Sequence, residues 1–274
     1  MELDQKTKPG MEALNEALIQ SLSRSMTASV RPYDTSKPEV YADDHSGLLQ
    51  AVARRNTPKL GELLKFAKAY DSNGFTALMY AAIDGYEDGV RILMGLEHGM
   101  RVNGSYSYGA YTFTEPTALM LASMHGRQGV VGLLKGLEAG LAERGMGATA
   151  LMIASIFNRS ECAEVLCDAE AGCIDVNGRT ALMWAAYRGN SMLVRVLRDA
   201  EAGLVDALGK AALVSASEHG NLACVKDLAD LEGRTHGVRA ITECCKGWGA
   251  SCSFKANIIQ FLRVYSEQRL EIFT

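Results

Sequence analysis

Residues 178–189 read Gly-Arg-Thr-Ala-Leu-Met-Trp-Ala-Ala-Tyr-Arg-Gly, and the Thr-Ala-Leu-Met string inside this stretch decides the fold because it recurs along the chain. The four full copies begin at Thr76, Thr117, Thr149 and Thr180. A fifth copy, Ala-Ala-Leu-Val, begins at Ala211, and the successive starts are 41, 32, 31 and 31 residues apart. Weaker copies begin at Ser46 and Arg239. A fixed period of this length is the sequence signature of a repeat architecture.

Each unit has the features of a short helix with a defined beginning and end. The threonine stands where a hydroxyl can accept a hydrogen bond from a free N–H group of the first turn. Nine residues after each start stands a glycine or, in one copy, Asn158, and both residue types accept the left-handed conformation that ends a helix. A second apolar stripe follows in every unit, so each unit predicts two helices. Because helices this short are marginal alone in water, they must be stabilised by stacking on their neighbours.

The string Gly-x-Thr-Ala-Leu-Met-x-Ala-Ala-x-x-Gly resembles the ankyrin repeat, whose usual form has Thr-Pro-Leu-His at the helix start. The resemblance covers about residues 46–265. The Thr-Ala-Leu-Met form, with Glu-Ala-Gly before the turn, is similar to the large ankyrin-repeat family of diplomonads such as Giardia. The resemblance implies an all-α fold: an ankyrin-repeat solenoid of about six to seven helix-turn-helix repeats with atypical end caps.

The sequence predicts three segments. Residues 1–45 contain an amphipathic stretch from Met11 to Met26 and a proline-containing linker, and the stretch either caps the first repeat or forms an arm that binds a partner. Residues 46–238 are expected to be the repeats, and residues 239–274 an irregular capping repeat, since a terminal repeat has one face without a neighbour.

An insertion interrupts the repeats within residues 101–116. The 41-residue spacing exceeds the 31-residue spacing by ten residues, and the additional stretch is rich in Tyr, Ser and Gly. This composition suits a binding loop, because tyrosine offers a large rigid contact area at low entropic cost. An inert hairpin packed on its own repeat explains the stretch equally well. Its aromatic residues are Tyr106, Tyr108, Tyr111 and Phe113.

The resemblance to ankyrin repeats also implies a binding surface on the concave face, formed by the turns and the first helices. The fourth, seventh and eighth positions after each unit start would face this groove or its floor. The candidate contact residues at these positions are Tyr80, Ile83, Met124, Ile156, Phe157, Trp184, Tyr187 and Arg188. Exposed clusters of aromatic residues and arginine are typical of binding hot spots. The alternative is that the fourth position belongs partly to the core.

Composition narrows the class of protein. The 274 residues include 28 basic and 32 acidic ones, for a net charge of −4, and no basic block indicates nucleic-acid binding. Seven cysteines, an odd number in a chain of this size, argue for a reducing compartment. Neither an apolar signal-peptide region nor an apolar run of about 20 residues is present, so we expect a soluble, cytoplasmic protein without membrane insertion.

No residue pattern indicates catalysis. The five histidines show no local pairing with cysteine of the kind that a Cys-His hydrolase needs. A zinc site can be drawn from His236, Cys244, Cys245 and Cys252, but it lacks Cys-x-x-Cys spacing, and buried structural cysteine is the simpler interpretation. We therefore predict a non-enzymatic, monomeric adaptor without cofactors that binds a protein partner. The alternative function is architectural, by self-assembly or association with the cytoskeleton.

Overall fold

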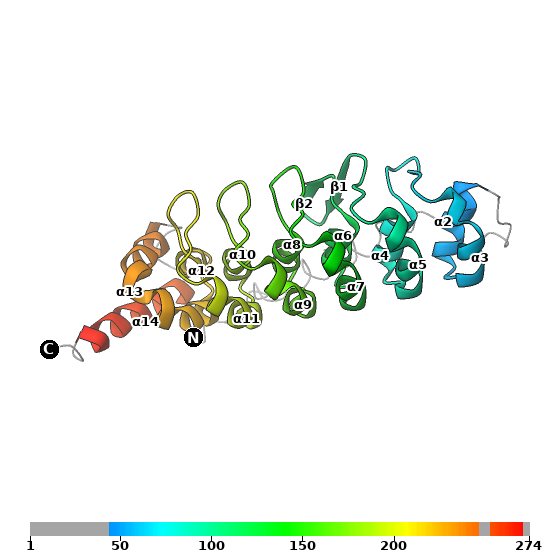
Figure 1. Cartoon of the computed structure of the whole chain (residues 1–274). Helices are drawn as coiled ribbons and strands as arrows, with labels where there is room; N and C mark the ends of the chain where they lie inside the picture. The colour runs from blue at the N-terminus through cyan, green and yellow to red at the C-terminus, as the bar shows by residue number, and fades with distance from the viewer. Residues whose placement is uncertain (1–43, 247–252, 271–274) are drawn as a thin grey trace, which may run out of the picture.

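The computed structural model describes residues 44–246 and 253–270, which form a row of helix pairs (Figure 1). The first helices of the pairs are α2 (His45–Ala53), α4 (Ala77–Asp84), α6 (Ala118–Met124), α8 (Ala150–Ile156), α10 (Ala181–Arg188) and α12 (Ala212–Glu218). The second helices are α3 (Thr57–Glu62), α5 (Glu87–Glu97), α7 (Gln128–Glu138), α9 (Ser160–Glu170), α11 (Ser191–Glu201) and α13 (Leu222–Lys246). A 3-10 turn (Leu64–Phe66) follows α3, and α14 (Ser253–Leu270) follows the last pair. The expected Met11–Met26 helix and its linker lie outside the described residues.

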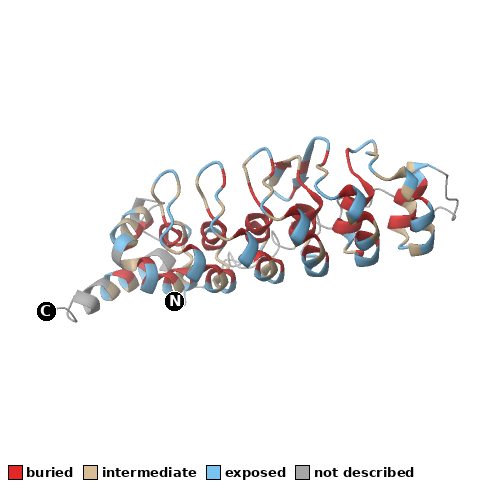
Figure 2. Ribbon diagram, viewed as in Figure 1, coloured by how far each residue is buried: buried red, intermediate tan, exposed pale blue. Residues whose placement is uncertain are grey.

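The pairs stack side by side into an all-α solenoid. From α2 to α12 each first helix contacts the first helix of the next pair, and from α3 to α13 each second helix contacts the next second helix. Figure 2 shows that buried residues concentrate where the helices face one another. The loops between pairs project along one edge as a row of fingers (Figure 1). The predicted repeat solenoid is confirmed.

Helices begin and end where the repeat pattern predicts. Thr180 is the N-cap of α10, and its hydroxyl accepts a hydrogen bond from the Met183 N–H at 3.4 Å. The same helix ends at Gly189, which has a left-handed φ of +76°. Asn158 replaces the glycine after α8 and adopts the same conformation, with a φ of +55°. Glycine and asparagine are therefore present because the chain must reverse at this point.

A buried glutamate in each second helix from α5 to α13 links neighbouring repeats. Its Oε2 accepts a hydrogen bond from the backbone N–H of the leucine in the first helix of the same repeat, at 2.7 Å in all five cases. Its Oε1 accepts a second hydrogen bond, at 2.9–3.0 Å, from a backbone N–H at the end of the preceding repeat, in the loop that leads into that first helix. We name these residues the glutamate staples: Glu97, Glu138, Glu170, Glu201 and Glu232, each no more than 1% exposed.

The glutamate staples take over much of the capping role that the sequence assigned to threonine. The leucine is the second residue of its helix, and its N–H has no acceptor within the helix. A carboxylate that accepts two N–H groups is satisfied despite its burial. For Glu232, burial raises the pKa of the carboxyl, while the hydrogen bonds from Gly203 and Leu213 act in the opposite direction.

The fingers are tight turns built around an aspartate. Oδ1 of Asp175 accepts hydrogen bonds from the N–H groups of Asn177 and Arg179, at 2.8 and 2.9 Å. Asp71 and Asp206 make the equivalent pairs of contacts in their own fingers. Backbone hydrogen bonds of 2.9 Å join neighbouring fingers, so the fingers form one connected edge.

The last repeat differs from the prediction. The weak copy at Arg239 does not begin a new repeat, because α13 runs without a break from Leu222 to Lys246. The predicted boundary between residues 238 and 239 therefore falls inside a helix. In the preceding repeat, α11 ends at Glu201, and Gly203, two residues later, has a left-handed φ of +85°. The residue two positions after Glu232 is Arg234 and not a glycine, so the helix continues.

Candidate binding face

Most of the predicted contact residues are buried. Met124 and Ile156 are completely inaccessible, because each is the last residue of a seven-residue helix that is packed between two neighbouring first helices. The candidate contact residues Ile156, Phe157, Trp184 and Tyr187, from two adjacent repeats, therefore do not form an exposed cluster. The other predicted contact residues that are buried are Tyr80, Ile83, Tyr106, Tyr108, Phe113 and Trp184. The alternative that the fourth position belongs to the core holds for Tyr80 and Trp184.

The insertion forms a two-stranded antiparallel hairpin of β1 (Ser105–Tyr108) and β2 (Tyr111–Thr114). Tyr106 stands opposite Phe113, and Tyr108 stands opposite Tyr111. Because residues that stand directly opposite each other share a face of the sheet, all four aromatic side chains lie on one face of the hairpin.

This aromatic face packs across several repeats. Tyr108 lies 4.6 Å from His125 and 5.0 Å from Phe157, measured between ring centroids. Tyr111 lies 5.7 Å from Phe157 and 6.4 Å from Trp184. The hairpin thus contacts residues at the ends of α6 and α8 and inside α10, and it covers the middle of the surface that the sequence predicted as open. It is neither a free binding loop nor a hairpin packed on its own repeat alone.

A neutral pair anchors the hairpin at its N-terminal strand. The Tyr106 hydroxyl lies 3.0 Å from His125 Nε2. Burial raises the pKa of Tyr106 to about 12. Burial also lowers the pKa of His125 to about 4, and the positive charges of Arg127 and Arg159 lower it further. Both groups are therefore uncharged at neutral pH, which suits a partly enclosed hydrogen bond.

The inner face is open beyond the hairpin. Tyr187 is 37% exposed, and its ring lies 4.2 Å from that of His219, which is also exposed. Arg188 is exposed, and Phe157 and Tyr111 are half-buried. We name Tyr187, Arg188 and His219 the open inner face.

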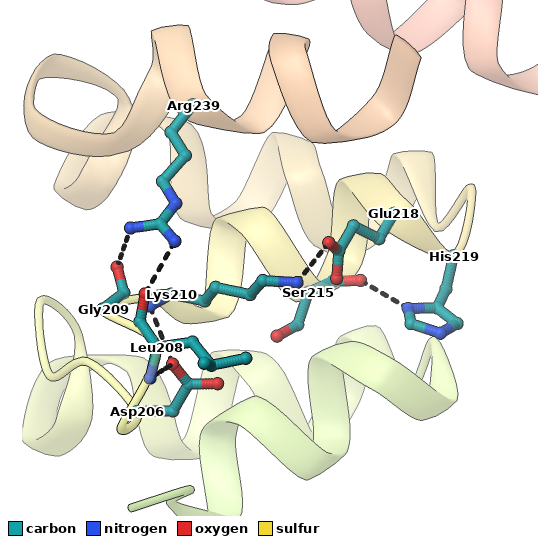
Figure 3. Close-up of polar contacts among 8 residues, drawn as sticks. All are labelled: Asp206, Leu208, Gly209, Lys210, Ser215, Glu218, His219 and Arg239. Carbon is teal, nitrogen blue, oxygen red and sulfur yellow. Dashed lines mark hydrogen bonds and ion pairs between the residues drawn. The ribbon is translucent and has the colours of Figure 1, made fainter. Parts of the chain in front are cut away.

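Polar side chains of the α12 repeat lie at the C-terminal end of this face (Figure 3). Lys210 Nζ lies 2.6 Å from Glu218 Oε1 across α12, and His219 donates a hydrogen bond from Nδ1 to the Ser215 carbonyl at 2.9 Å. Arg239 reaches from α13 to the finger before α12 (Figure 3). The inner face therefore changes from aromatic under the hairpin to polar at the C-terminal end.

Trp184 joins these two parts. Its indole N–H donates a hydrogen bond to Asp175 Oδ2 at 3.3 Å, and the guanidinium of Arg179 lies 5.1 Å from the ring centroid. This distance allows a cation–π interaction. The contacts fix the indole at the base of a finger, so Trp184 acts as support for Tyr187, whose ring is 5.7 Å away.

The metal-ligand and thiol chemistry that the sequence raised depends on how the His, Cys, Asp and Glu side chains of the described residues lie. Among residues 44–246 and 253–270, no three His, Cys, Asp or Glu side chains gather closely enough to hold a metal ion. Burial raises the pKa of Cys162 and of Cys224 to about 11, which keeps these two thiols protonated and unreactive at neutral pH. The arrangement instead offers shape, aromatic surface and hydrogen-bonding groups.

Comparison with known families identifies the repeat. A family model of three ankyrin repeats matches residues 167–238, and a model of a single ankyrin repeat matches residues 73–103. This chain contains ankyrin repeats. The matched residues contain the pairs α4–α5 and α10–α11, the helix α12 and the first part of α13, and the 105–114 hairpin directly follows the first match.

Solved structures include a similar helical-repeat protein. One chain of a structure titled "Bd0816 Predatory Endopeptidase from Bdellovibrio bacteriovorus in complex with immunity protein Bd3460" matches with a TM-score of 0.52 and 26% sequence identity. The match covers 67% of the present chain and 96% of that chain. No curated protein matches the sequence. None of the helices in the described ranges combines the length and hydropathy needed to cross a membrane.

Proposed function

We propose that this ankyrin-repeat protein is an adaptor that binds a protein partner through the open inner face. The observation that carries the proposal is the exposed Tyr187 ring beside His219 and Arg188, next to a hairpin that covers the middle of the predicted binding surface. Tyrosine and arginine are the residue types that dominate binding energy at protein interfaces. Ankyrin repeats generally mediate protein–protein interaction, and the similar solved structure is of a complex between two proteins.

From the sequence we also propose a cytoplasmic location, a monomeric state, the absence of catalysis and of nucleic-acid binding, and a relation to the diplomonad ankyrin-repeat family. A protein partner fits best because the face combines aromatic, cationic and hydrogen-bonding groups.

Affinity capture from native lysate tests the proposal. The variant Tyr187→Ala/Arg188→Glu changes the open inner face, and both side chains are exposed, so the fold should persist. The matched control is Met192→Ala/Arg91→Glu, which makes the same kinds of change at exposed positions on the second helices α11 and α5. We expect a protein captured by wild type and by the control to be lost from the inner-face variant.

Equal capture by all three proteins would show that the open inner face is not the binding surface. Self-association of the wild-type chain without any captured partner would favour the architectural alternative. Circular dichroism of each variant establishes beforehand that loss of capture does not come from unfolding.

A further inference from the structure

The last two fingers carry a group of exposed aliphatic side chains. These residues are between 40% and 69% exposed, whereas such side chains are ordinarily the most buried in a protein. We name the group the finger ridge: Ile174, Val176, Leu204, Val205 and Leu208. A backbone hydrogen bond of 2.9 Å from the Ala207 N–H to the Asn177 carbonyl joins the two fingers that carry the ridge.

The turns themselves do not require aliphatic residues. The first finger builds the same turn around Asp71, with hydrogen bonds of 2.9 and 2.8 Å to the N–H groups of Asn73 and Phe75. That finger has the polar Ser72 where the later finger has Val176, at the position after the aspartate. Since a polar residue supports this turn equally well, the exposed valine has no role in shaping the finger. Clustered exposed apolar residues mark interaction surfaces.

Two arginines accompany these two fingers. Arg239 Nη2 donates to the Leu208 carbonyl at 2.7 Å, and Nη1 donates to the Gly209 carbonyl at 2.8 Å (Figure 3). Arg179 follows the Ile174–Gly178 turn and lies over the Trp184 ring. No carboxylate of the described residues forms an ion pair with either arginine. Both are half-buried, so each can still donate to a carboxylate that approaches from solvent.

We propose that the finger ridge, with Arg179 and Arg239, is the docking surface for a segment of a protein partner that carries aliphatic residues together with Asp or Glu. Aliphatic side chains would cover the ridge, and carboxylates would bind the two guanidiniums. The chain as a whole is acidic, with a net charge of −4, so attraction of an acidic segment must come from these local groups. The inference rests on the proposed protein-binding function and adds the chemistry of the partner segment that binds at the turns.

Selection of displayed random peptides on the immobilised full chain tests the inference. The ridge variant is Ile174→Ser/Val176→Ser/Leu208→Ser, and Arg179→Glu tests the charge. The control Leu96→Ser/Leu137→Ser/Met192→Ser removes three exposed apolar side chains from the second helices. We expect the enriched peptides to combine aliphatic and acidic residues. Their affinity should fall about tenfold or more in the ridge variant and in Arg179→Glu, and stay unchanged in the control.

Four results would overturn the inference. They are no enrichment, enrichment of basic peptides, peptides whose binding survives the ridge variant, and a wild-type dimer in sedimentation that the ridge variant abolishes. The dimer would make a second copy of the chain the occupant. Peptides that survive the ridge variant but are lost from Tyr187→Ala/Arg188→Glu would leave the proposed function standing and remove the ridge alone. If the ridge variant unfolds at a lower urea concentration than wild type, the single substitution Leu208→Ser replaces it in the binding measurement. Unchanged peptide affinity in Leu208→Ser and in Arg179→Glu would then overturn the inference.

Discussion

Replacing Glu170 by glutamine tests whether the glutamate staples hold neighbouring repeats together. Glu170 Oε2 accepts a hydrogen bond from the Leu151 N–H at 2.7 Å, and Oε1 accepts one from the Gly140 N–H at 3.0 Å. The side chain is 1% exposed, so water cannot replace a lost acceptor. A glutamine amide keeps one acceptor oxygen but turns its NH2 group toward the second N–H.

The expected loss follows from these two contacts. A hydrogen bond to a charged group contributes about 1.5–3 kcal/mol, and a buried donor without an acceptor costs about 1–3 kcal/mol. Removing the charge recovers part of the cost of burying a carboxylate. We therefore expect Glu170→Gln to lower the free energy of unfolding by about 2 kcal/mol. Glu170→Ala, which removes both acceptors and leaves a cavity, should lower it by about 4 kcal/mol.

Urea unfolding of the full chain at neutral pH, followed by circular dichroism, measures the effect. The matched control is Glu164→Gln, an identical change at an exposed position of the same helix, which should leave the midpoint almost unchanged. Midpoints and slopes are compared together, because long repeat arrays can depart from two-state unfolding. Equal midpoints for Glu170→Gln and Glu164→Gln would refute the role of the staples.

The hairpin and the helix ends give three more predictions. Burial lowers the pKa of His125 from 6.5 to about 4, so between these values the unfolded chain binds a proton that the folded chain does not. As pH falls through this window, wild type should lose about 2 kcal/mol of stability relative to His125→Gln; parallel pH profiles in urea unfolding would contradict this. Tyr108→Ala removes the ring contacts to His125 and Phe157 and should lower the unfolding free energy by about 3 kcal/mol, against a negligible change for the exposed Tyr70→Ala. Asn158→Ala should cost about 1 kcal/mol because of its left-handed φ, whereas Asn158→Gly should be nearly neutral in the same assay.

The repeats and their helix ends could be predicted because their signals are local. A glycine or Asn158 at a fixed distance from each Thr-Ala-Leu-Met start requires only that the chain reverse at that residue. The same local reasoning failed at Arg239, where an apolar tetrapeptide resembled a repeat start. The missing signal was a glycine two residues after Glu232, without which α13 has no reason to end.

The glutamate staples were not predicted, although their signal was present. Every staple except Glu232 precedes Ala-Gly or His-Gly at the end of an apolar stripe, and this string was interpreted from the sequence only as part of a turn. Glu170 accepts hydrogen bonds from residues 19 and 30 positions earlier in the chain. An acidic residue that recurs at one position in every repeat, next to core residues, indicates a buried carboxylate with backbone donors.

The candidate site was predicted less well than the fold, because its burial depends on contacts between distant residues. Helical spacing identified the inner positions, but spacing alone does not show that Met124 and Ile156 are enclosed by helices on both sides. The aromatic insertion was recognised as unusual. Its packing on Trp184, which lies 73 residues after Tyr111, could not be derived from the composition of the loop.

The hairpin determines where a partner can bind. By covering His125, Phe157 and part of Trp184, it occupies with the protein's own side chains the surface that a partner would otherwise contact in the middle of the stack. The open inner face and the finger ridge both lie beyond it, between Ile174 and His219. The open inner face consists of exposed aromatic and charged side chains, and the finger ridge consists of exposed aliphatic ones. A partner that contacts both surfaces therefore needs to span only the repeats of α10 and α12.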